Sequence, residues 1–280
     1  MRRGRLLKRL FDEAGLRCGV YSFDIIGDIA ILKFIGGFLE DAGVIARRLL
    51  EELPNVRVVL GQVSPVSGVF RVRKLVWLAG ENRFETVHRE YGCLFKVDLS
   101  KCYFSPRLQF ERFRIAKLVK PNEVVINMFA GVGCFSIIIA KYSSASKIYS
   151  IDLNPHAYNY MCENIRLNKV ENRVVPILGD AKEIILNRLV DVANRVLMPL
   201  PEKAYEYLDY ALKALKGEGY IHYYDFVKSG KNENPIKKGV LKVSEKLKSL
   251  NVDFEIGFGR VVRSVGPRNY QIVLDIFVKL

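Results

Sequence analysis

VVINMFAGVGCFS, residues 124–136, carries the strongest structural signal in this chain. A short β-branched run turns there into a loop of small residues, and the loop opens an apolar helix, Phe135–Ala140. Glycine in a strand-to-helix turn lets a ligand lie against bare backbone, where a side chain would block it. A second β-rich run, Lys147–Ile151, ends at Asp152, and an acid in that place can accept the hydroxyls of a ribose. The pattern predicts a site for a nucleoside-containing cofactor.

From residue 123 onward, β-rich runs alternate with helical segments. Alternation of this kind is typical of an α/β fold with a doubly wound, mostly parallel sheet. The last two runs lie close together in the sequence, so we expect an antiparallel hairpin at one edge. Helices are expected between the strands, for example at Pro155–Asn168 and Lys203–Leu215. The expected strands are Val124–Asn127, Lys147–Ile151, Val174–Leu178, Arg195–Met198, Gly219–Tyr224, Phe254–Val262 and Gln271–Val278.

The first part of the chain is organised differently and predicts a small α+β domain of its own. We place this domain at residues 1–96 and the cofactor-binding domain at residues 97–280, with an amphipathic helix at Gln109–Val119. The elements expected in the first domain are helices at Arg5–Ala14 and Glu40–Glu52, β-rich runs within Phe23–Phe34, and strands at Val56–Leu60 and Phe70–Trp77.

Charge and cysteine content narrow the class of protein. Lys and Arg outnumber Asp and Glu by 44 to 30 over 280 residues, a formal net charge of +14. This excess attracts a polyanion such as nucleic acid, although it can also serve solubility alone. The five cysteines show no zinc-type spacing with the three histidines, so we expect no metal. No apolar run is long enough for a bilayer and no signal-peptide core follows the basic N-terminus, which favours a cytoplasmic protein.

Two further strand ends bear on which cofactor the glycine loop holds. A dinucleotide site needs glycine or alanine where Ser136 stands, whereas the observed loop, with an acid after the next strand, also fits S-adenosylmethionine. Asp180 follows the third strand, where an acceptor for the adenine amino group would lie. Pro199 and Pro201 follow the fourth strand, in a rigid loop at the carboxyl edge of the sheet. Together these positions favour S-adenosylmethionine.

Each of these positions also has a simpler explanation. Asn154 and Pro155 suit the N-cap and first turn of a helix, whatever Asp152 binds. Asp180 can be an ordinary turn residue. The two prolines can end a strand, although one proline is enough for that. Four strand ends in register favour the cofactor site over these alternatives.

Several motifs, in order along nearly the whole chain, carry a resemblance to a known family. They are Phe23–Asp28, Phe104–Leu108, Glu111-Arg112, Asn127–Gly133, Asn164–Asn168 with Asn172-Arg173, Ile221–Tyr224 and Gly266–Tyr270. In these motifs the chain resembles the archaeal and eukaryotic tRNA (guanine-37-N1)-methyltransferases. The resemblance implies a class I, Rossmann-like domain dependent on S-adenosylmethionine, preceded by a small α+β domain. The outer domain with which many members begin is expected to be missing.

The resemblance implies methyl transfer to N1 of guanine-37, in the anticodon region of tRNA. The N1 proton must leave and negative charge builds on O6, so the reaction needs a carboxylate base and a cation. The family's base corresponds to Glu111, beside Arg112. Its cation corresponds to Arg71, with Arg73 as the fallback on the same strand face.

The resemblance also distributes the site residues among roles. Catalytic roles fall on Glu111, Arg71, Arg112 and Pro199. Cofactor-binding roles fall on Phe129, Ala130, Gly131, Gly133, Asp152, Leu153, Asp180, Ala181 and Pro199. Substrate-binding roles fall on Arg107, Arg73, Leu200, Pro201 and Tyr223. From the residues alone, Glu111 would instead be a solvated helix carboxylate paired with Arg107 or Arg114 at helical spacing.

Two positions depart from the family pattern. Asn127 replaces the aspartate that usually ends the first strand, so it cannot pair by charge with the cationic cofactor. Pro199 replaces the asparagine of an Asn-Leu-Pro loop that contacts the guanine, and proline has no side-chain donor or acceptor. Glu111 is retained, so proton removal should survive in a differently shaped base pocket. The loop resembles that of an archaeal subgroup, some of whose members also methylate 4-demethylwyosine, a tricyclic base, at C7. A larger, less polar pocket would admit such a base as well as guanine, so the resemblance implies a second candidate activity.

Two other activities stay open. Aminocarboxypropyl transfer in the wyosine pathway uses the same scaffold but needs no N1 base, so Glu111 speaks against it. A non-catalytic tRNA-binding protein is the other, and the carboxylates Asp152 and Asp180 speak against that. We expect a monomer that binds tRNA and no membrane. The basic segments expected to contact tRNA are the N-terminus, Arg47-Arg48, Arg71–Lys74, Lys228–Lys238 and Arg263 with Arg268.

Overall fold

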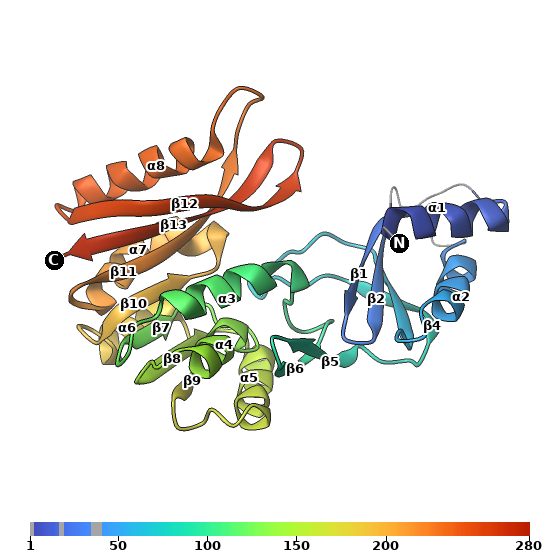
Figure 1. Cartoon of the computed structure of the whole chain (residues 1–280), viewed down its shortest axis with the longest axis horizontal. Coiled ribbons are helices and arrows are strands. Elements are labelled where there is room, and N and C mark those ends of the chain that lie inside the picture. Colours follow the sequence, from blue (N-terminus) through green and yellow to red (C-terminus); the bar gives the residue numbers. More distant parts are fainter. Residues whose placement is uncertain (1–2, 17–19, 35–40) are drawn as a thin grey trace. The chain divides into compact units, whose positions relative to one another are not determined.

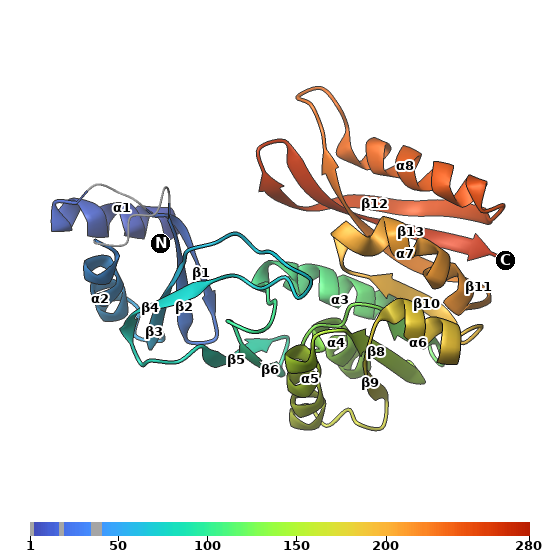
Figure 2. The same ribbon diagram turned by 180° about the vertical axis from the view of Figure 1, so that it is seen from behind.

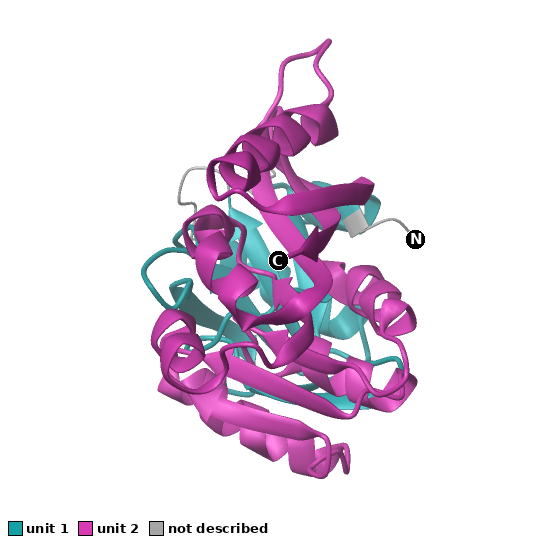
Figure 3. Cartoon of the chain, turned by 90° about the vertical axis from the view of Figure 1, so that its left-hand side faces the viewer, with its two compact units in different colours: residues 1–106 teal, residues 107–280 magenta. Residues whose placement is uncertain are grey.

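A computed structural model describes residues 3–16, 20–34 and 41–280 of the chain. The chain divides into two compact units, Met1–Pro106 (unit 1) and Arg107–Leu280 (unit 2), coloured separately in Figure 3. Glu40, expected to begin a helix, lies outside the described residues. So do Cys18 and Met1-Arg2, the start of the basic N-terminal segment.

Unit 1 is built on a four-stranded sheet with the order β1-β2-β3-β4. β2 and β3 are parallel, and the other two neighbouring pairs are antiparallel. Two helices pack their apolar residues on this sheet, and a two-stranded hairpin, β5–β6, follows it. The elements are α1 (Arg3–Ala14), β1 (Val20–Ile26), β2 (Ile29–Phe34), α2 (Ala42–Glu52), β3 (Val58–Gln62), β4 (Leu75–Gly80), β5 (Glu85–Glu90) and β6 (Cys93–Asp98).

The strand expected at Phe70–Trp77 is wrong in its first half. β4 begins only at Leu75, because the preceding residues form a tight turn in which the Arg71 N–H donates to the Gly68 carbonyl (3.1 Å). Gly68 and Arg71 both have positive φ, +73° and +54°. Val69 and Phe70, which made this segment look like a strand, are largely exposed. No strand was expected at residues 85–98, where the β5–β6 hairpin forms.

Unit 2 contains a seven-stranded sheet with the order β12-β13-β11-β10-β7-β8-β9. The strands from β7 to β11 are parallel, and β13 and β12 complete one edge as an antiparallel hairpin, which confirms the doubly wound prediction. Its elements are α3 (Gln109–Leu118), β7 (Val124–Asn127), α4 (Cys134–Tyr142), β8 (Lys147–Asp152), α5 (Pro155–Leu167), β9 (Val174–Leu178), α6 (Ala181–Arg188), β10 (Ala193–Met198), α7 (Pro201–Ala214), β11 (Leu215–Lys228), α8 (Pro235–Ser249), β12 (Asp253–Gly266) and β13 (Asn269–Lys279).

Helices cover both faces of this sheet, and the two faces differ in chemistry. α3, α4 and α5 lie on one face, and α6, α7 and α8 lie on the other (Figures 1 and 2). Because side chains alternate along a strand, Ile221 and Tyr223 of β11 join the apolar core under α6–α8. His222 and Tyr224, between and after them, face α3 and bind polar partners there. Among the described residues, no helix is long and apolar enough to cross a membrane.

A buried ion pair fixes the start of β10 to the loop before β7. Arg195 is 1% exposed and donates to both carboxylate oxygens of Glu123, at 2.7 and 2.9 Å. We expect Arg195→Gln to lower the free energy of unfolding by about 3–5 kcal/mol, because Glu123 would stay buried without its cation. Denaturant unfolding measures the change. The matched control, Arg9→Gln, removes a partly exposed partner of Glu52 and should cost less than about 1 kcal/mol. Equal losses in the two variants would contradict the assignment.

Candidate active site

The glycine loop lies in unit 2 at the carboxyl end of β7. Gly131 and Gly133 both have positive φ, +57° and +91°, which favours glycine over any other residue. A Cβ on Gly133 would lie 3.1 Å from Met161 Cγ and 3.2 Å from Ile137 Cδ1. A Cβ on Gly131 would meet nothing within 4 Å. Gly133 therefore serves close packing, whereas Gly131 keeps an open stretch of backbone bare.

Asp152 ties the end of β8 to this loop. Its Oδ2 accepts the Gly131 N–H at 2.6 Å, and its Oδ1 accepts the Asn154 N–H at 2.9 Å. Burial raises the pKa of Asp152 more than these two bonds lower it. Each carboxylate oxygen keeps a lone pair for a further donor such as a ribose hydroxyl. Asn154 also caps α5 by accepting the His156 N–H, so the helix start and the carboxylate site exist side by side.

Asp180 has a partner that sequence reasoning missed. It caps α6 by accepting the Lys182 N–H (2.8 Å), and the Tyr207 hydroxyl of α7 donates to its Oδ2 at 2.9 Å. Burial and this hydrogen bond raise the pKa of Tyr207, which keeps the phenol protonated as a donor. The Tyr207 ring also packs edge-on against Phe129 of the glycine loop, with centroids 5.4 Å apart. Nothing in the sequence distinguishes Tyr207 from the tyrosines two residues before and three residues after it.

Asn127 is fully buried and takes part in a neutral polar network under the loop. Its Nδ2 donates to Ser136 Oγ (3.1 Å), and Ser150 Oγ donates to the same oxygen (2.6 Å). From α5, Asn164 Nδ2 donates to the Val132 carbonyl at 3.0 Å and fixes the loop from the other side. An amide needs no counter-charge in such a place, whereas an aspartate would. This environment accounts for asparagine at the end of β7.

Glu111 is not solvated. It lies in the first turn of α3 with a side chain 1% exposed. Arg114 Nη2 and the Tyr224 hydroxyl donate to its Oε1 at 2.7 and 2.9 Å. The pairing with Arg114 that helical spacing suggested is therefore present, but in a buried setting. Arg112 is also buried, and its guanidinium lies 6.0 Å from the centre of the Phe135 ring in α4.

The structure places Tyr224, not Tyr223, next to Glu111. Tyr223 is fully buried in the core under α6–α8, and its hydroxyl donates to Asp225 Oδ2 at 3.1 Å. Tyr224 instead packs its ring edge-on against Phe135, with centroids 6.1 Å apart, and so connects Glu111 to the helix that follows the glycine loop.

The other expected residues of unit 2, apart from Arg107, lie just after strands of the sheet. Pro199 directly follows β10, Leu200 is the N-cap of α7, and Pro201 is its first residue. Leu153 is 45% exposed beside Asp152, and Ala181 is buried at the start of α6. Arg107 is exposed, in the 3-10 turn Pro106–Leu108.

Arg71 and Arg73 lie in unit 1, and the expectation that they share a strand face is wrong. Both precede β4, and the tight turn at Arg71 removes the regular alternation that would align them. The Arg71 guanidinium lies 5.3 Å from the centre of the Tyr103 ring. Arg73 Nη2 donates to the Phe104 carbonyl at 2.9 Å, so this arginine braces the segment that contains Phe104.

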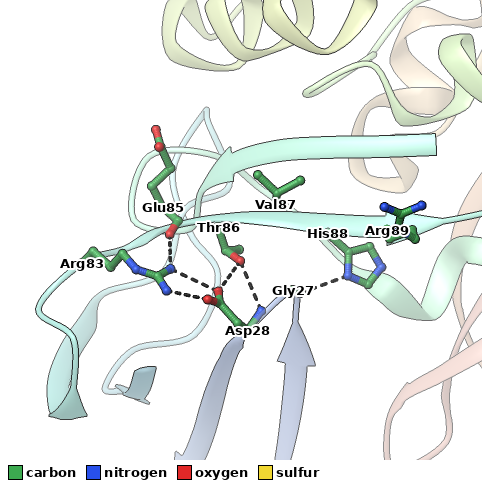
Figure 4. A pocket seen from close by; sticks show the side chains of 8 residues that line it. All are labelled: Gly27, Asp28, Arg83, Glu85, Thr86, Val87, His88 and Arg89. Atoms are coloured by element: carbon green, nitrogen blue, oxygen red, sulfur yellow. Dashed lines mark hydrogen bonds and ion pairs between the residues drawn. The ribbon is translucent and has the colours of Figure 1, made fainter. Parts of the chain in front are cut away.

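A hollow of about 670 Å³ in unit 1 is lined in part by Gly27 and Asp28, the end of the motif Phe23–Asp28 (Figure 4). Asp28, in the turn between β1 and β2, binds the Arg83 guanidinium through both carboxylate oxygens and accepts the Thr86 hydroxyl (2.7 Å). The preceding Gly27 donates its N–H to His88 Nδ1 (3.1 Å). The Gly27-Asp28 pair thus clasps the turn to β5, which is a structural role. Within the described part of the chain, no cluster of three His, Cys, Asp or Glu could hold a metal ion.

Two family models match the chain. The model of the TRM5/TYW2 methyltransferase domain matches residues 86–253, and the model of the TYW2 N-terminal domain matches residues 5–83. The tRNA (guanine(37)-N(1))-methyltransferase Trm5b of Pyrococcus abyssi is 43% identical over 254 residues, 91% of this chain and 74% of that protein. Its crystal structure superposes with a TM-score of 0.85 at 39% identity, covering 100% of this chain and 81% of the other.

Two further relatives carry other names. The tRNA 4-demethylwyosine(37)-methyltransferase Taw21 of Saccharolobus solfataricus is 39% identical over 272 residues, 97% of this chain and 98% of that protein. The tRNA(Phe) (4-demethylwyosine(37)-C(7)) aminocarboxypropyltransferase of Methanocaldococcus jannaschii is 37% identical over 252 residues, 89% and 95% of the two chains. One scaffold thus carries different transfers among these relatives.

The two loop glycines give a paired prediction. We expect Gly131→Ala to weaken binding of S-adenosylhomocysteine about tenfold, or about 1.4 kcal/mol, because the added methyl projects into open space where a ligand would lie. Gly133→Ala should lose more stability than Gly131→Ala, since packing conflict adds to a left-handed backbone cost of about 1–2 kcal/mol common to both. Titration calorimetry and thermal unfolding measure the two effects. Unchanged affinity in Gly131→Ala would show that the loop does not face the cofactor.

Proposed function

Since the chain belongs to the TRM5/TYW2 methyltransferase family, we propose that it transfers the methyl group of S-adenosylmethionine to N1 of guanine-37 in tRNA. The observation that carries this proposal is the buried carboxylate of Glu111, held by Arg114 and Tyr224 in unit 2. A carboxylate is costly to bury, and neither of the two wyosine-directed transfers to carbon needs a base for a ring N–H. A carboxylate fixed at this place fits a substrate whose ring N–H must lose its proton.

The residues around the glycine loop fit the proposed cofactor. Three features match the parts of S-adenosylmethionine in turn: bare backbone at Gly131 for the sulfonium-bearing amino-acid chain, two oxygens of Asp152 with lone pairs for the ribose, and Asp180 at the next strand end for the adenine. We propose that Phe129, Ala130, Gly133, Leu153, Ala181 and Pro199 complete this binding surface. S-adenosylmethionine supplies an electrophilic methyl group on sulfur. Every other part of the reaction falls to the chain.

Glu111 is the proposed base, and its two oxygens have different environments. Oε1 accepts Arg114 Nη2 and the Tyr224 hydroxyl, and Arg114 Nε lies 3.1 Å from it as well. Among the described residues, the one hydrogen bond to Oε2 comes from Arg114 Nε, at 3.1 Å, and Arg260 Nη1 lies 4.0 Å from the same oxygen. Oε2 therefore keeps the lone pair that would take the N1 proton. The N1 lone pair then forms the bond to the methyl carbon as the carbon–sulfur bond breaks.

The remaining roles rest on the family resemblance. Arg71 is the proposed cation for developing charge on O6, with Arg73 as the fallback, and Arg112 is proposed to act beside Glu111. We propose that residues 1–96 serve tRNA binding and residues 97–280 carry out the transfer. Arg107, Leu200, Pro201 and Tyr223 stand as proposed substrate-side residues. For Tyr223 the burial described above leaves only an indirect role, through the packing of β11.

Methylation of 4-demethylwyosine at the same tRNA position is the second candidate. Two observations favour it: Pro199 offers the base no side-chain hydrogen bond, and this chain matches nearly the whole length of Taw21. Aminocarboxypropyl transfer is the third, because a relative with that name is nearly as similar. The cofactor product separates them, since methyl transfer leaves S-adenosylhomocysteine and aminocarboxypropyl transfer leaves methylthioadenosine.

Glu111→Gln should lower the rate of methylation of guanine-37 by about 10²–10⁴-fold, because the amide cannot take the N1 proton. Single-turnover transfer of labelled methyl to a transcript tRNA measures the rate. Affinity for S-adenosylhomocysteine is the control and should not change. The same transcript with adenine, which has no N1 proton, should not be methylated, whereas inosine keeps that proton and should. Rapid methylation of guanine by the Gln variant would overturn the assignment.

Pro199→Asn tests the substrate end of the site. An asparagine there restores an amide able to hydrogen-bond guanine, so we expect a rise in kcat/KM for guanine-37 relative to 4-demethylwyosine. A well-placed hydrogen bond is worth about 1 kcal/mol, or about fivefold. Paired assays on the two tRNAs with the wild type and the variant measure the ratio. If the ratio stays the same, Pro199 does not contribute to the choice of base.

A further inference from the structure

A chain of buried and half-buried polar side chains extends from Glu111 across the sheet face that α3 covers. Arg114 links Glu111 to Asp275 of β13, through Nη1 to Oδ2 at 2.6 Å and Nη2 to Oδ1 at 3.0 Å. His222 of β11 continues the chain with Nδ1 2.6 Å from Asp275 Oδ1. Arg195 Nη1 then lies 2.7 Å from His222 Nε2. Glu111, Arg114 and Asp275 alternate in charge, and the His222 ring joins Asp275 to Arg195.

The hydrogen-bond pattern fixes the state of His222. Arginine has no acceptor, so His222 Nε2 must accept from Arg195, and the ring proton must lie on Nδ1, facing Asp275. Burial lowers the pKa of His222 more than Asp275 raises it, which keeps the ring neutral. Burial alone would raise the pKa of Asp275, but the hydrogen bonds from His222 and Arg114 outweigh it and hold the carboxylate ionised.

Arg114 is therefore shared between two carboxylates, and its position is set from β13. Both of its terminal nitrogens bind Asp275, while Nε and Nη2 bind Glu111. Its guanidinium also lies 4.7 Å from the centre of the Phe258 ring. Because Asp275 and Phe258 also hold the guanidinium, Arg114 fixes the position of Glu111 Oε1. The orientation of the carboxylate, and with it the direction of Oε2, is thereby set.

We propose that Arg114 is a positioning residue for the base: Asp275 and His222 hold its guanidinium in place, and the guanidinium holds Glu111 Oε1 and supplies a positive charge beside that carboxylate. This inference rests on the proposed role of Glu111. The positive charge of Arg114 is divided, because Asp275 competes with Glu111 for it. Removing Arg114 and removing Asp275 should therefore shift the acidic limb of the pH profile in opposite directions.

The groups facing Glu111 come from four elements. Arg114 lies on its own helix, α3, and the Tyr224 hydroxyl comes from β11. Arg260 of β12 approaches Oε2, with Nη1 at 4.0 Å. Asp275 of β13 acts through Arg114. Two cations thus face the carboxylate directly, and the second anion stands behind one of them.

The test is the pH dependence of single-turnover methyl transfer, followed through the acidic limb where the base becomes protonated. Arg114→Gln removes a cation, so the carboxyl holds its proton more firmly and the limb should move up by about one to three pH units. Asp275→Asn removes the competing anion, so the limb should move down. Arg114→Lys keeps the charge and should restore the limb most of the way. The proposal would be overturned if the acidic limb stays in place in Arg114→Gln and Asp275→Asn, or if it moves in the same direction in both.

If Arg114→Gln does not fold, the second cation near Glu111, Arg260, can be replaced instead. Arg260 is 29% exposed, so its loss is easier to tolerate, and Arg260→Gln should move the limb up by less than Arg114→Gln. Binding of S-adenosylhomocysteine confirms that each variant is folded, and Arg9→Gln serves as the surface control with an unmoved limb. An unmoved limb in both Arg260→Gln and Asp275→Asn would reject the proposal without Arg114→Gln.

The outcome stays distinct from that of the proposed function. If Glu111→Gln methylates guanine as fast as the wild type, Glu111 is not the base and the proposed function fails first. If Glu111→Gln is inactive while the limbs of the Arg114, Asp275 and Arg260 variants stay with the wild type, Glu111 remains the base and only the positioning role is lost.

Discussion

A charge removed from water must be neutralised by a partner, and this constraint decides how α3 lies on its sheet. The helix has polar contacts at both ends and in the middle: Glu111 with Tyr224 of β11, Arg114 with Asp275 of β13, and the Leu118 carbonyl with Arg195 of β10. These contacts join the helix to three neighbouring strands. If one partner were lost, the buried charges that remain would oppose the packing that now holds the helix.

The parts of this architecture that depend on local pattern were predictable. Strand ends at Asn127, Asp152 and Leu178 follow from β-branched runs closed by turn residues, and the edge hairpin follows from two such runs close together. What the sequence did not reveal depends on packing. β11 is buried on both faces, so alternation could not tell whether Tyr223 or Tyr224 looks toward α3. The first part of the strand expected at Phe70–Trp77 is likewise a turn, because Gly68 and Arg71 adopt positive φ, which an extended strand does not have.

The two ends of the site are built on different principles. Beneath the glycine loop, the cofactor end uses a neutral cluster of Asn127, Ser136 and Ser150, and its carboxylates Asp152 and Asp180 accept from backbone N–H groups without a cation in these bonds. The base end uses full charges arranged in alternation. Neutral contacts change little with pH, whereas the alternating charges all depend on one another. Pro199 takes part in neither set of hydrogen bonds, since it directly follows β10 and has no side-chain donor or acceptor.

The clasp of Gly27 and Asp28 in unit 1 bears on how modules of this family can be exchanged. One family model ends at residue 83 and the other begins at residue 86, so the boundary between them divides the partners of the Gly27-Asp28 turn. Arg83 falls on the N-terminal side, and Thr86 and His88 fall on the C-terminal side. A chimera joined there would separate the turn from two of its three partners and leave polar groups without a match. The β5–β6 hairpin must therefore travel with the N-terminal module. A junction after Asp98, where β6 ends, keeps the clasp whole.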